Sequence, residues 1–442
     1  MAYTNFIAAI YLGTSRITGI VGRNDAGTLT VIAYETEAAA GSIIRGCVHN
    51  VKEAAARIRR VIQKLELRIP GSRIEKVYVG TGGQSIRSVE RSVSLTLEAE
   101  SIVTEEILDR LYRECSACLP DGQDVLSILP SACFLDGRME TEPVGVACSR
   151  IEARYNLIVA RPSVRKLIAK CMEFAGRGLA GIAVSPLTLA DVVLSEGEKN
   201  RGCALIDFGA GVTSLSVYKN GRPAYLCVIP LGSNLITRDI EDFLKISEPE
   251  AEALKRKYGN ALANRDDTST FQINQEQTGP LSVKIADFNE VVTARLQEIL
   301  ENVYDKLESA VELKALRAGI IITGKAANME NLTALIYDRL RTDVRYATLR
   351  EDLTVKINSP EAHPDGVALG LLLQGQANCA APLPTPPQPV PPPAPAPPPP
   401  PPPVVKAEEP PAAKESPAPP KKKKKKLGDG LGNFVGRLFD EP

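Results

Sequence analysis

The sequence predicts an α/β fold in which one strand–turn–strand unit occurs twice. The first copy spans residues 6–34 and the second spans residues 203–229. In each copy an apolar strand ends at a glycine-containing turn, a second strand follows, and a turn with Asp or Asn and Gly leads into a third strand. A unit that appears twice indicates a duplicated domain with two facing turns. Helical periodicity between and after the copies provides the helices of an α/β protein.

The second copy carries the residues that suggest chemistry. Asp207 ends an apolar strand, and Gly209, Ala210 and Gly211 form the turn after it. Because glycines lack Cβ atoms, backbone N–H groups there could close on a phosphate, and Asp207 could hold a hydrated metal ion beside it. The alternative is a glycine-turned hairpin with a surface aspartate. The similar turn at residues 13–15 favours two turns that grip a polyphosphate.

Composition limits the class of protein. A chain of 442 residues has room for two or more domains, and its 53 basic and 53 acidic side chains balance, so we expect no nucleic-acid partner. Only Cys115 and Cys118 form a C-x-x-C pair, and the chain has two histidines. These features favour packed thiols in a reducing cytoplasm over a zinc site. The sequence predicts neither a secretory leader nor a membrane-spanning run.

The elements follow in order from periodicity and turn signals. Segment 85–154 has short alternating strands and one helix, which indicates an inserted α+β unit, whereas the polar segment 260–280 is interpreted as loop-rich. A capping-box pattern at 287–290 predicts the start of a long helix. The other predicted helices are 51–65, 105–118, 163–175, 186–194, 235–244, 249–258 and 328–341, and the other predicted strands are 76–80, 155–160 and 318–323.

The amino-acid composition of the C-terminal tail changes twice along the sequence. Residues 380–420 hold 21 of the 34 prolines, which predicts a disordered, extended linker. Six lysines at 421–426 precede an apolar stripe at helical spacing, formed by Leu427, Leu431, Phe434, Val435, Leu438 and Phe439. Such a helix rises only ~20 Å, too short to cross a bilayer but suited to its interface, where the lysines add attraction to an anionic membrane surface.

Other interpretations of the tail are a helix that docks on a partner protein, or a lysine patch for nuclear import or nucleic acid. No aromatic residue lies among the lysines, which argues against nucleic acid. Four glycines within the segment disfavour a helix in water, so we expect the helix to form on contact with the membrane. The sequence therefore predicts a reversible membrane anchor.

Three motifs carry a family resemblance. IYLGTS at 10–15, DFGAGVT at 207–213 and IITGKA at 321–326 resemble the two phosphate motifs and the adenosine motif of the actin-like ATPases, whose fold is ribonuclease-H-like. Further stretches resemble the FtsA family of bacterial cell-division proteins, as does a terminal amphipathic helix after a low-complexity linker. These stretches are VYVGTGGQSIRS at 77–88, EPVGVACSRIEARYNLIVA at 142–160, VIPLGSNLITRDI at 228–240 and EAEALKRKYGNA at 250–261.

The resemblance covers about residues 5–375 and 427–439, and it implies two lobes around one nucleotide cleft. The implied parts are subdomain 1A (5–84 and 155–202), the FtsA-specific subdomain 1C (85–154), subdomain 2A (203–232 and 316–375), subdomain 2B (233–315), a Pro/Lys-rich linker (376–426) and the membrane-targeting helix (427–440).

The resemblance also implies ATP and Mg²⁺ as ligands, with Asp207 at the metal. Gly232 and Gly324 would allow close backbone approach, and Glu252 and Lys255 match helix positions that contact the ribose in relatives. The implied nucleotide-binding residues are Gly13, Thr14, Ser15, Asp207, Gly209, Ala210, Gly211, Thr213, Gly232, Glu252, Lys255, Gly324 and Lys325.

Two positions depart from the family pattern. Tyr11 stands where the first phosphate motif usually has an acidic residue, and it cannot hold a hydrated magnesium ion as a carboxylate does. Lys325 replaces the second glycine of the adenosine motif and would crowd the base. We therefore expect nucleotide binding with weak or absent hydrolysis, and no catalytic residue is assigned.

The resemblance implies partners as well. Subdomain 1C would make filament contacts by self-association, subdomain 2B would bind the tubulin-like protein FtsZ, and other divisome proteins would join. The site of action would be the cytoplasmic face of the inner membrane at the division site. The alternatives are an actin-like kinase or ATPase, which would need an acidic residue at position 11, and a pilus-assembly-type scaffold.

Overall fold

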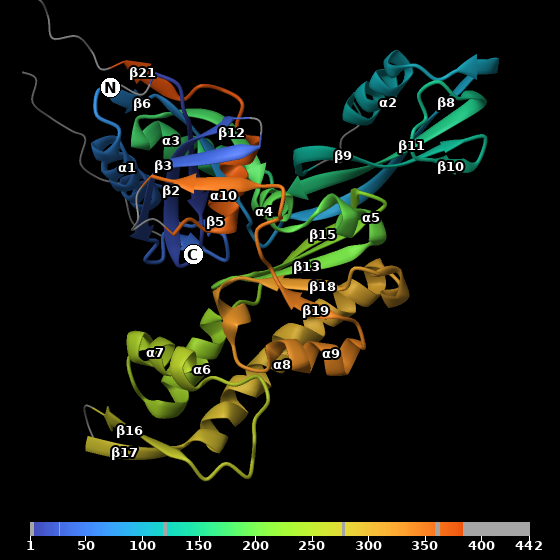
Figure 1. The fold of residues 1–442 in the computed structure, drawn as a ribbon. Helices are drawn as coiled ribbons and strands as arrows, with labels where there is room; N and C mark the ends of the chain where they lie inside the picture. Colours follow the sequence, from blue (N-terminus) through green and yellow to red (C-terminus); the bar gives the residue numbers. More distant parts are fainter. Residues whose placement is uncertain (1–3, 26, 118–121, 276–278, 359–362, 383–442) are drawn as a thin grey trace, which may run out of the picture. The chain divides into compact units, whose positions relative to one another are not determined.

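The computed structural model describes residues 4–25, 27–117, 122–275, 279–358 and 363–382. The predicted membrane-targeting helix and nearly all of the predicted linker lie outside these residues. Two large sheets form the body (Figure 1). The first has the order β12 (Gly178–Val184), β7 (Lys76–Thr81), β1 (Ile7–Leu12), β2 (Arg16–Asp25), β3 (Thr28–Ala38) and β20 (Thr354–Ile357).

The second sheet has nine strands. Their order is β10 (Arg138–Glu140), β9 (Asp124–Leu135), β11 (Ala147–Ala160), β8 (Arg87–Ile102), β15 (Arg222–Ile229), β14 (Thr213–Lys219), β13 (Cys203–Phe208), β18 (Ile320–Thr323) and β19 (Val344–Tyr346).

The two sheets contain the same five-stranded unit. In the first, β1, β2 and β3 pair antiparallel, while β7 runs parallel to β1 and β12 runs parallel to β7. In the second, β13, β14 and β15 pair antiparallel, while β18 runs parallel to β13 and β19 runs parallel to β18. The predicted duplication is therefore confirmed.

Helices cover both faces of the first sheet. On one face lie α1 (Val51–Arg68) and α3 (Ser163–Ala175), with buried apolar side chains spaced three or four residues apart on α1. On the other face lie α4 (Ser185–Val193) and α10 (Gly366–Gln374). The core around α4 and α10 also contains Cys203, Leu205 and Ile321 from the second sheet, so this layer is shared by both sheets.

The second sheet packs its remaining face on α6 (Asn234–Leu244), α8 (Ile285–Ala310) and α9 (Leu332–Leu340). Next to α6 lies α7 (Glu248–Tyr258), which begins with the capping box formed by Ser247 and Glu250. The short helix α5 (Glu196–Arg201) packs against β14 and β15. No helix in the described ranges is both long enough and apolar enough to cross a membrane.

One prediction in this region is wrong, and one hairpin was not predicted. Helix α8 begins at Ile285, before the supposed capping box at 287–290, and the side chain of Asn289 accepts a hydrogen bond from the backbone N–H of Asn260. Segment 260–280 is loop-rich up to residue 269, and after it β16 (Thr270–Gln275) and β17 (Gly279–Lys284) form the unpredicted hairpin. Phe271 holds this hairpin by stacking on Tyr258 and meeting Phe288 edge-on.

The predicted insert forms an α+β unit whose strands are long rather than short. Strands β8, β9 and β11 have 16, 12 and 14 residues and pair along most of their length. Together with α2 (Glu105–Ala117) they enclose a core of their own. Cys115 is buried in that core, whereas Cys118 lies outside the described residues. The unit joins the second sheet where Arg87 of β8 pairs with Cys227 of β15.

Candidate nucleotide-binding site

The two predicted turns have the same backbone design. A Cβ atom on Gly13 would lie 2.7 Å from the carbonyl oxygen of Arg16, and one on Gly209 would lie 2.8 Å from that of Val212. In each turn, then, a glycine allows the chain to approach the residue three positions later. Tyr11 pairs with Thr18 and Asp207 pairs with Ser214, so the residue two before each glycine occupies the same place in its hairpin.

The structure brings the two turns together. A Cβ atom on Gly211 would lie 2.5 Å from Oγ1 of Thr14, so the first turn touches the second at its glycine. Oγ1 of Thr14 accepts a hydrogen bond of 2.9 Å from the backbone N–H of Gly46, and Oγ1 of Thr213 donates one of 2.9 Å to the carbonyl of Leu231. These hydroxyl groups fix both turns against their neighbours.

Gly232 and Gly324 also lie at the second turn. A Cβ atom on Gly232 would come within 2.5 Å of the backbone at residues 210–212. Gly324 has a φ of 93° and would bring a Cβ atom within 2.6 Å of a carboxylate oxygen of Asp207. In this structure both glycines let neighbouring backbone pack on the second turn and on Asp207.

The equivalent residues Tyr11 and Asp207 differ in chemistry. Burial, together with the charge of Asp365, raises the pKa of Asp207 to about 6. Burial and the charges of Asp207 and Asp365 raise the pKa of Tyr11 well above its ordinary value. The Tyr11 ring packs beside the first turn, with Cε1 3.3 Å from the position of a Cβ atom on Gly13. The first turn therefore presents a neutral ring where the second presents an acid.

Asp365 was missed in the sequence, although an Asp-Gly pair before an apolar run is a helix-start signal. Its Oδ1 accepts a hydrogen bond of 2.9 Å from the N–H of Ala368 and so caps α10. Its Oδ2 lies 3.4 Å from the hydroxyl of Tyr34 and 3.6 Å from Nη2 of Arg16. Asp365 and Arg16 therefore join the site from segments about 350 residues apart in sequence.

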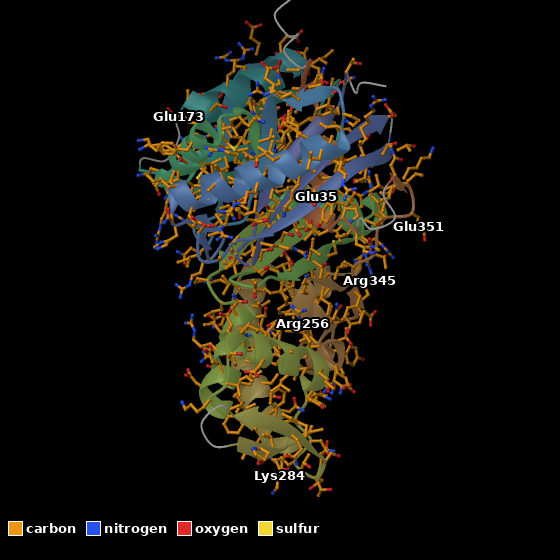
Figure 2. The ribbon with its side chains drawn as sticks, turned by 90° about the vertical axis from the view of Figure 1, so that its left-hand side faces the viewer. Glu35, Glu173, Arg256, Lys284, Arg345 and Glu351 are labelled. Atoms are coloured by element: carbon orange, nitrogen blue, oxygen red, sulfur yellow. The ribbon has the colours of Figure 1, made fainter. Side chains whose placement is uncertain are left out.

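Lys255 and Glu252 are held by partners from α6 and α7. Nζ of Lys255 donates to the carbonyl of Ser233 at 3.1 Å and to Oγ1 of Thr237 at 2.7 Å, and it pairs with Glu252 at 2.5 Å. Burial lowers the pKa of Lys255, whose side chain anchors α7 on α6. The other Glu252 oxygen accepts a hydrogen bond of 2.9 Å from Arg256, which is labelled in Figure 2.

Positive charge gathers at the adenosine motif. Lys325 is exposed at the start of the 3-10 helix η2 (Lys325–Asn328). Partial burial of its ammonium group, followed by the charges of Arg16 and Arg256, lowers the pKa of Lys325. Asp365 and Glu252 oppose this shift. Three cations with two nearby carboxylates suit a polyphosphate that carries a bound cation.

The residues present fit a nucleotide with Mg²⁺. No group of three or more His, Cys, Asp or Glu side chains suited to a metal occurs within the described ranges. Mg²⁺ needs no such cage, because it keeps several waters and binds phosphate oxygens with one or two carboxylates. Oγ of Ser185 is buried without a hydrogen-bond partner, and it would lie 3.3 Å from a Cβ atom on Gly80, the register partner of Tyr11.

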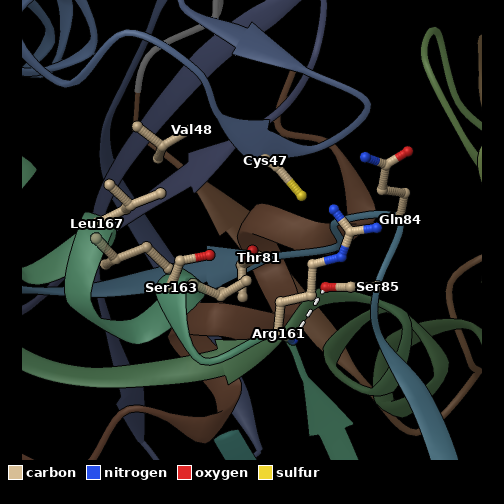
Figure 3. Close-up of a pocket in the computed structure, with 10 residues that line it drawn as sticks. Cys47, Val48, Thr81, Gln84, Ser85, Arg161, Ser163 and Leu167 are labelled. Carbon is tan, nitrogen blue, oxygen red and sulfur yellow. Dashed lines mark hydrogen bonds between the residues drawn. The ribbon is translucent and has the colours of Figure 1, made fainter. Parts of the chain in front are cut away.

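A separate cavity lies at the start of α3 (Figure 3). It measures about 170 Å³ and is lined by Cys47, Thr81, Gln84, Arg161, Leu167 and their neighbours. The N–H of Arg161 donates to Oγ of Ser85 at 3.3 Å beside it. Pockets for ligands of nucleotide size measure roughly 300–1,000 Å³, and none of the predicted site residues lines this cavity. It is therefore distinct from the site at the two turns.

Comparison with known proteins identifies the family. The chain matches a family model described as "Cell division protein FtsA" over residues 204–364 and one described as "SHS2 domain inserted in FTSA" over residues 83–159. It is 36% identical over 352 residues to the cell division protein FtsA of Porphyromonas gingivalis, covering 78% of this chain and 73% of the relative. To FtsA of Bacillus subtilis it is 30% identical over 346 residues, covering 76% and 77%.

Among solved structures, the PilM-PilN type IV pilus biogenesis complex resembles the chain with a TM-score of 0.56 and 15% identity, covering 83% of this chain and 97% of that chain. At this identity the likeness supports the actin-like fold alone. The sequence identity to the two FtsA proteins and the match to the inserted SHS2 domain go further. The chain belongs to the FtsA family of cell division proteins.

Proposed function

We propose that this protein binds ATP with Mg²⁺ between its two turns, assembles with copies of itself, and holds FtsZ filaments at the cytoplasmic face of the inner membrane at the division site. The observation that carries the nucleotide part is the meeting of two equivalent glycine turns, with Gly211 against Thr14 and Gly324 against Asp207. Membership in a family of cell division proteins supports the assembly role.

Each group at the turns has a task in this proposal. The N–H groups of Gly13 and Gly209 already donate to the carbonyls of Arg16 and Asp207. Other backbone N–H groups of the two turns would bind phosphate oxygens, and Asp207 would hold the cation through its water shell. Glu252 and Arg256 on α7 would reach the ribose side, with Lys255 positioning Glu252. A cation held at Asp207 would neutralise phosphate charge.

Slow turnover follows from Tyr11. A phosphate-transfer site needs groups that orient the attacking water and stabilise charge as it develops. Tyr11 is neutral and packs on the first turn, so it provides neither a general base nor a carboxylate for the metal. We expect ATP to act as a bound structural ligand that is hydrolysed slowly or not at all.

Both surfaces that we propose for protein contacts carry exposed apolar side chains. Subdomain 2B, proposed to receive FtsZ, exposes Phe243, Leu262 and Leu281. The inserted unit, proposed for filament contacts, exposes Ile102, Tyr112, Met139, Val144 and Val146. Other divisome proteins would bind at surfaces that remain free in the filament.

Co-sedimentation with anionic liposomes and FtsZ tests the tether. The full chain should carry FtsZ into the liposome pellet, and a chain without residues 427–442 should leave FtsZ in the supernatant. Phe434→Asp should act like the truncation because it places a charge on the apolar stripe, whereas Asp440→Asn, off the stripe, should not. Unchanged liposome binding by the truncated chain would rule out the tether.

A further inference from the structure

The outer side of helices α1 and α3 is strongly basic. The two helices carry nine basic and three acidic side chains, whereas the whole chain balances 53 of each. They lie side by side on the first sheet, where the guanidinium group of Arg59 on α1 donates to the carbonyl of Phe174 on α3. Figure 2 views the molecule from the side of α1. An excess of positive charge is therefore concentrated on one layer of a neutral molecule.

Acidic neighbours neutralise only part of this charge. On the edge of α1 toward β3, the carboxylates of Glu35 and Glu37 pair with Arg60, Lys64 and Arg68. Lys52 on α1 and Lys166 and Lys170 on α3 are exposed, and they form no ion pair with any described residue. These three lysines keep their full charge available to a partner outside the chain.

Two large apolar side chains project from the same side. Leu67, near the end of α1, is 82% exposed, and Phe174, near the end of α3, is 50% exposed. Lys166, Lys170 and Phe174 are four residues apart, so they share one side of α3. The exposed acid of α3 is Glu173, labelled in Figure 2. The α1–α3 face is defined here as Lys52, Arg59, Leu67, Lys166, Lys170 and Phe174.

The described chain ends beside this face. Strand β6 (Ser72–Ile74) follows directly after α1, and the N–H of Ile74 donates to Oε1 of Glu66 on α1 at 2.9 Å. Strand β21 (Ala380–Pro382) pairs with β6, and Pro382 lies opposite Ser72 (Figure 1). The predicted linker and membrane-targeting helix therefore continue from a point close to the end of α1.

A long linker cannot by itself choose which side of the body meets a membrane. If residues 383–426 are extended, they reach on the order of 130 Å, so the body could turn freely. The attraction between lysines and anionic lipid falls off within about 8–10 Å, and it acts only after the tail has brought the body close. The chain leaves the body at its basic side, which favours lipid over an acidic protein as the partner of this face.

We propose that the α1–α3 face lies on the anionic membrane surface, with Leu67 and Phe174 at the headgroups and the three unpaired lysines on lipid phosphates. Lysines next to exposed Leu and Phe side chains are typical of surfaces that bind a membrane interface. The inference rests on the proposed membrane tether, and it adds the orientation in which the tethered body is held.

A single tryptophan tests this contact in the full chain. The sequence contains no Trp, so Leu67→Trp introduces one reporter at an exposed position. On vesicles of phosphatidylglycerol and phosphatidylethanolamine its emission should shift to shorter wavelength, and brominated lipid should quench it. The matched control is Leu281→Trp on β17, at a side chain that is 39% exposed, and its emission should not change.

Charge reversal measures the electrostatic part. Adding Lys166→Glu and Lys170→Glu to Leu67→Trp should weaken vesicle binding about tenfold or more and remove the emission shift, because two attractions become repulsions. Lys219→Glu with Lys284→Glu makes the same charge change at two exposed lysines elsewhere, and it should leave the emission shift intact.

The outcomes separate the contact from the tether. If Leu67→Trp binds vesicles without an emission shift, or if reversal of Lys166 and Lys170 changes nothing, the membrane role of the α1–α3 face is overturned and the tether stands. If Phe434→Asp leaves both binding and the shift of Leu67→Trp unchanged, the tether fails and the face stands. If Leu67→Trp and the wild type bind no vesicles, both proposals fail.

Discussion

The first and second turns share a backbone and differ in chemistry. Both turns use a glycine to bring the chain against a carbonyl three residues later, at Gly13 and Gly209. In both hairpins, the residue two before the glycine pairs with a residue that carries a hydroxyl group, Thr18 or Ser214. Yet this residue is Tyr11 in the first copy and Asp207 in the second. The duplicated fold thus keeps the same backbone packing in both copies, whereas the side chain two residues before the glycine differs between them.

The difference has a physical basis. The glycine contacts are backbone contacts, so any larger residue there must displace main chain, and both copies share that constraint. The side chains at positions 11 and 207 instead face a partly buried polar site. Either a neutral ring or an acid can be accommodated there if neighbouring side chains balance the difference in charge. Near the first turn, the carboxylate of Asp365, at the start of α10, lies 3.6 Å from the guanidinium group of Arg16.

The largest expected effect tests the shared backbone. Gly13→Ala and Gly209→Ala should each destabilise the protein by about 2–3 kcal/mol, because the added Cβ atom would meet a backbone carbonyl at 2.7 or 2.8 Å. Thermal unfolding of both variants measures this. Gly197→Ala in α5 is the control, since the nearest atom to its Cβ position is 4.0 Å away. A neutral result at one turn alone would show that the copies are not built alike.

The next effect is a pH dependence of stability that we expect from Asp207 and not from Tyr11. The folded state raises the pKa of Asp207 to about 6 from an ordinary 3.8, so it holds the proton more tightly than the unfolded chain does. The contribution of Asp207 to the stability of the wild type should therefore fall by on the order of 2–3 kcal/mol as pH rises from about 4 to about 6, with little further change above, as measured by the difference from Asp207→Asn. Urea unfolding across this range should show that Asp207→Asn removes the loss.

Tyr11→Phe provides the comparison for that experiment. Tyr11 is neutral throughout this range because its pKa is raised, so its variant should keep the pH dependence of the wild type. Asp352→Asn, at an exposed aspartate, should keep it too. A pH profile that is unchanged in Asp207→Asn would show that this carboxyl group is not responsible for the loss.

The smallest effect concerns Lys325. If its positive charge attracts phosphate, Lys325→Ala should weaken nucleotide binding about three- to tenfold, as expected for a partly exposed ion contact worth roughly 1 kcal/mol. If the side chain instead crowds the base, the same variant should bind more tightly. Nucleotide titration distinguishes the two, with Lys314→Ala at an exposed lysine as the control.

Local sequence signals were sufficient for much of the fold. The glycine turns, the strands beside them and helix α3 follow the predicted pattern, because each depends on spacing within a few residues. The hairpin β16–β17 was missed, since its strand character comes from the contacts of Phe271 with Tyr258 and Phe288. The start of α8 was also wrong, because Asn289 is used by Asn260 and not by the helix terminus.

The sequence by itself determined that the protein is a duplicated α/β structure with two glycine turns. Glycines at turns and alternating apolar residues in strands can be recognised within a few residues of sequence. Tertiary structure decided which side chains share the site. Asp365 and Tyr34 are 331 positions apart, and Thr14 and Gly211 nearly 200. The spacing of residues in the sequence cannot predict such pairs. Each contact forms only when α10 packs on the first sheet or when the two turns come together.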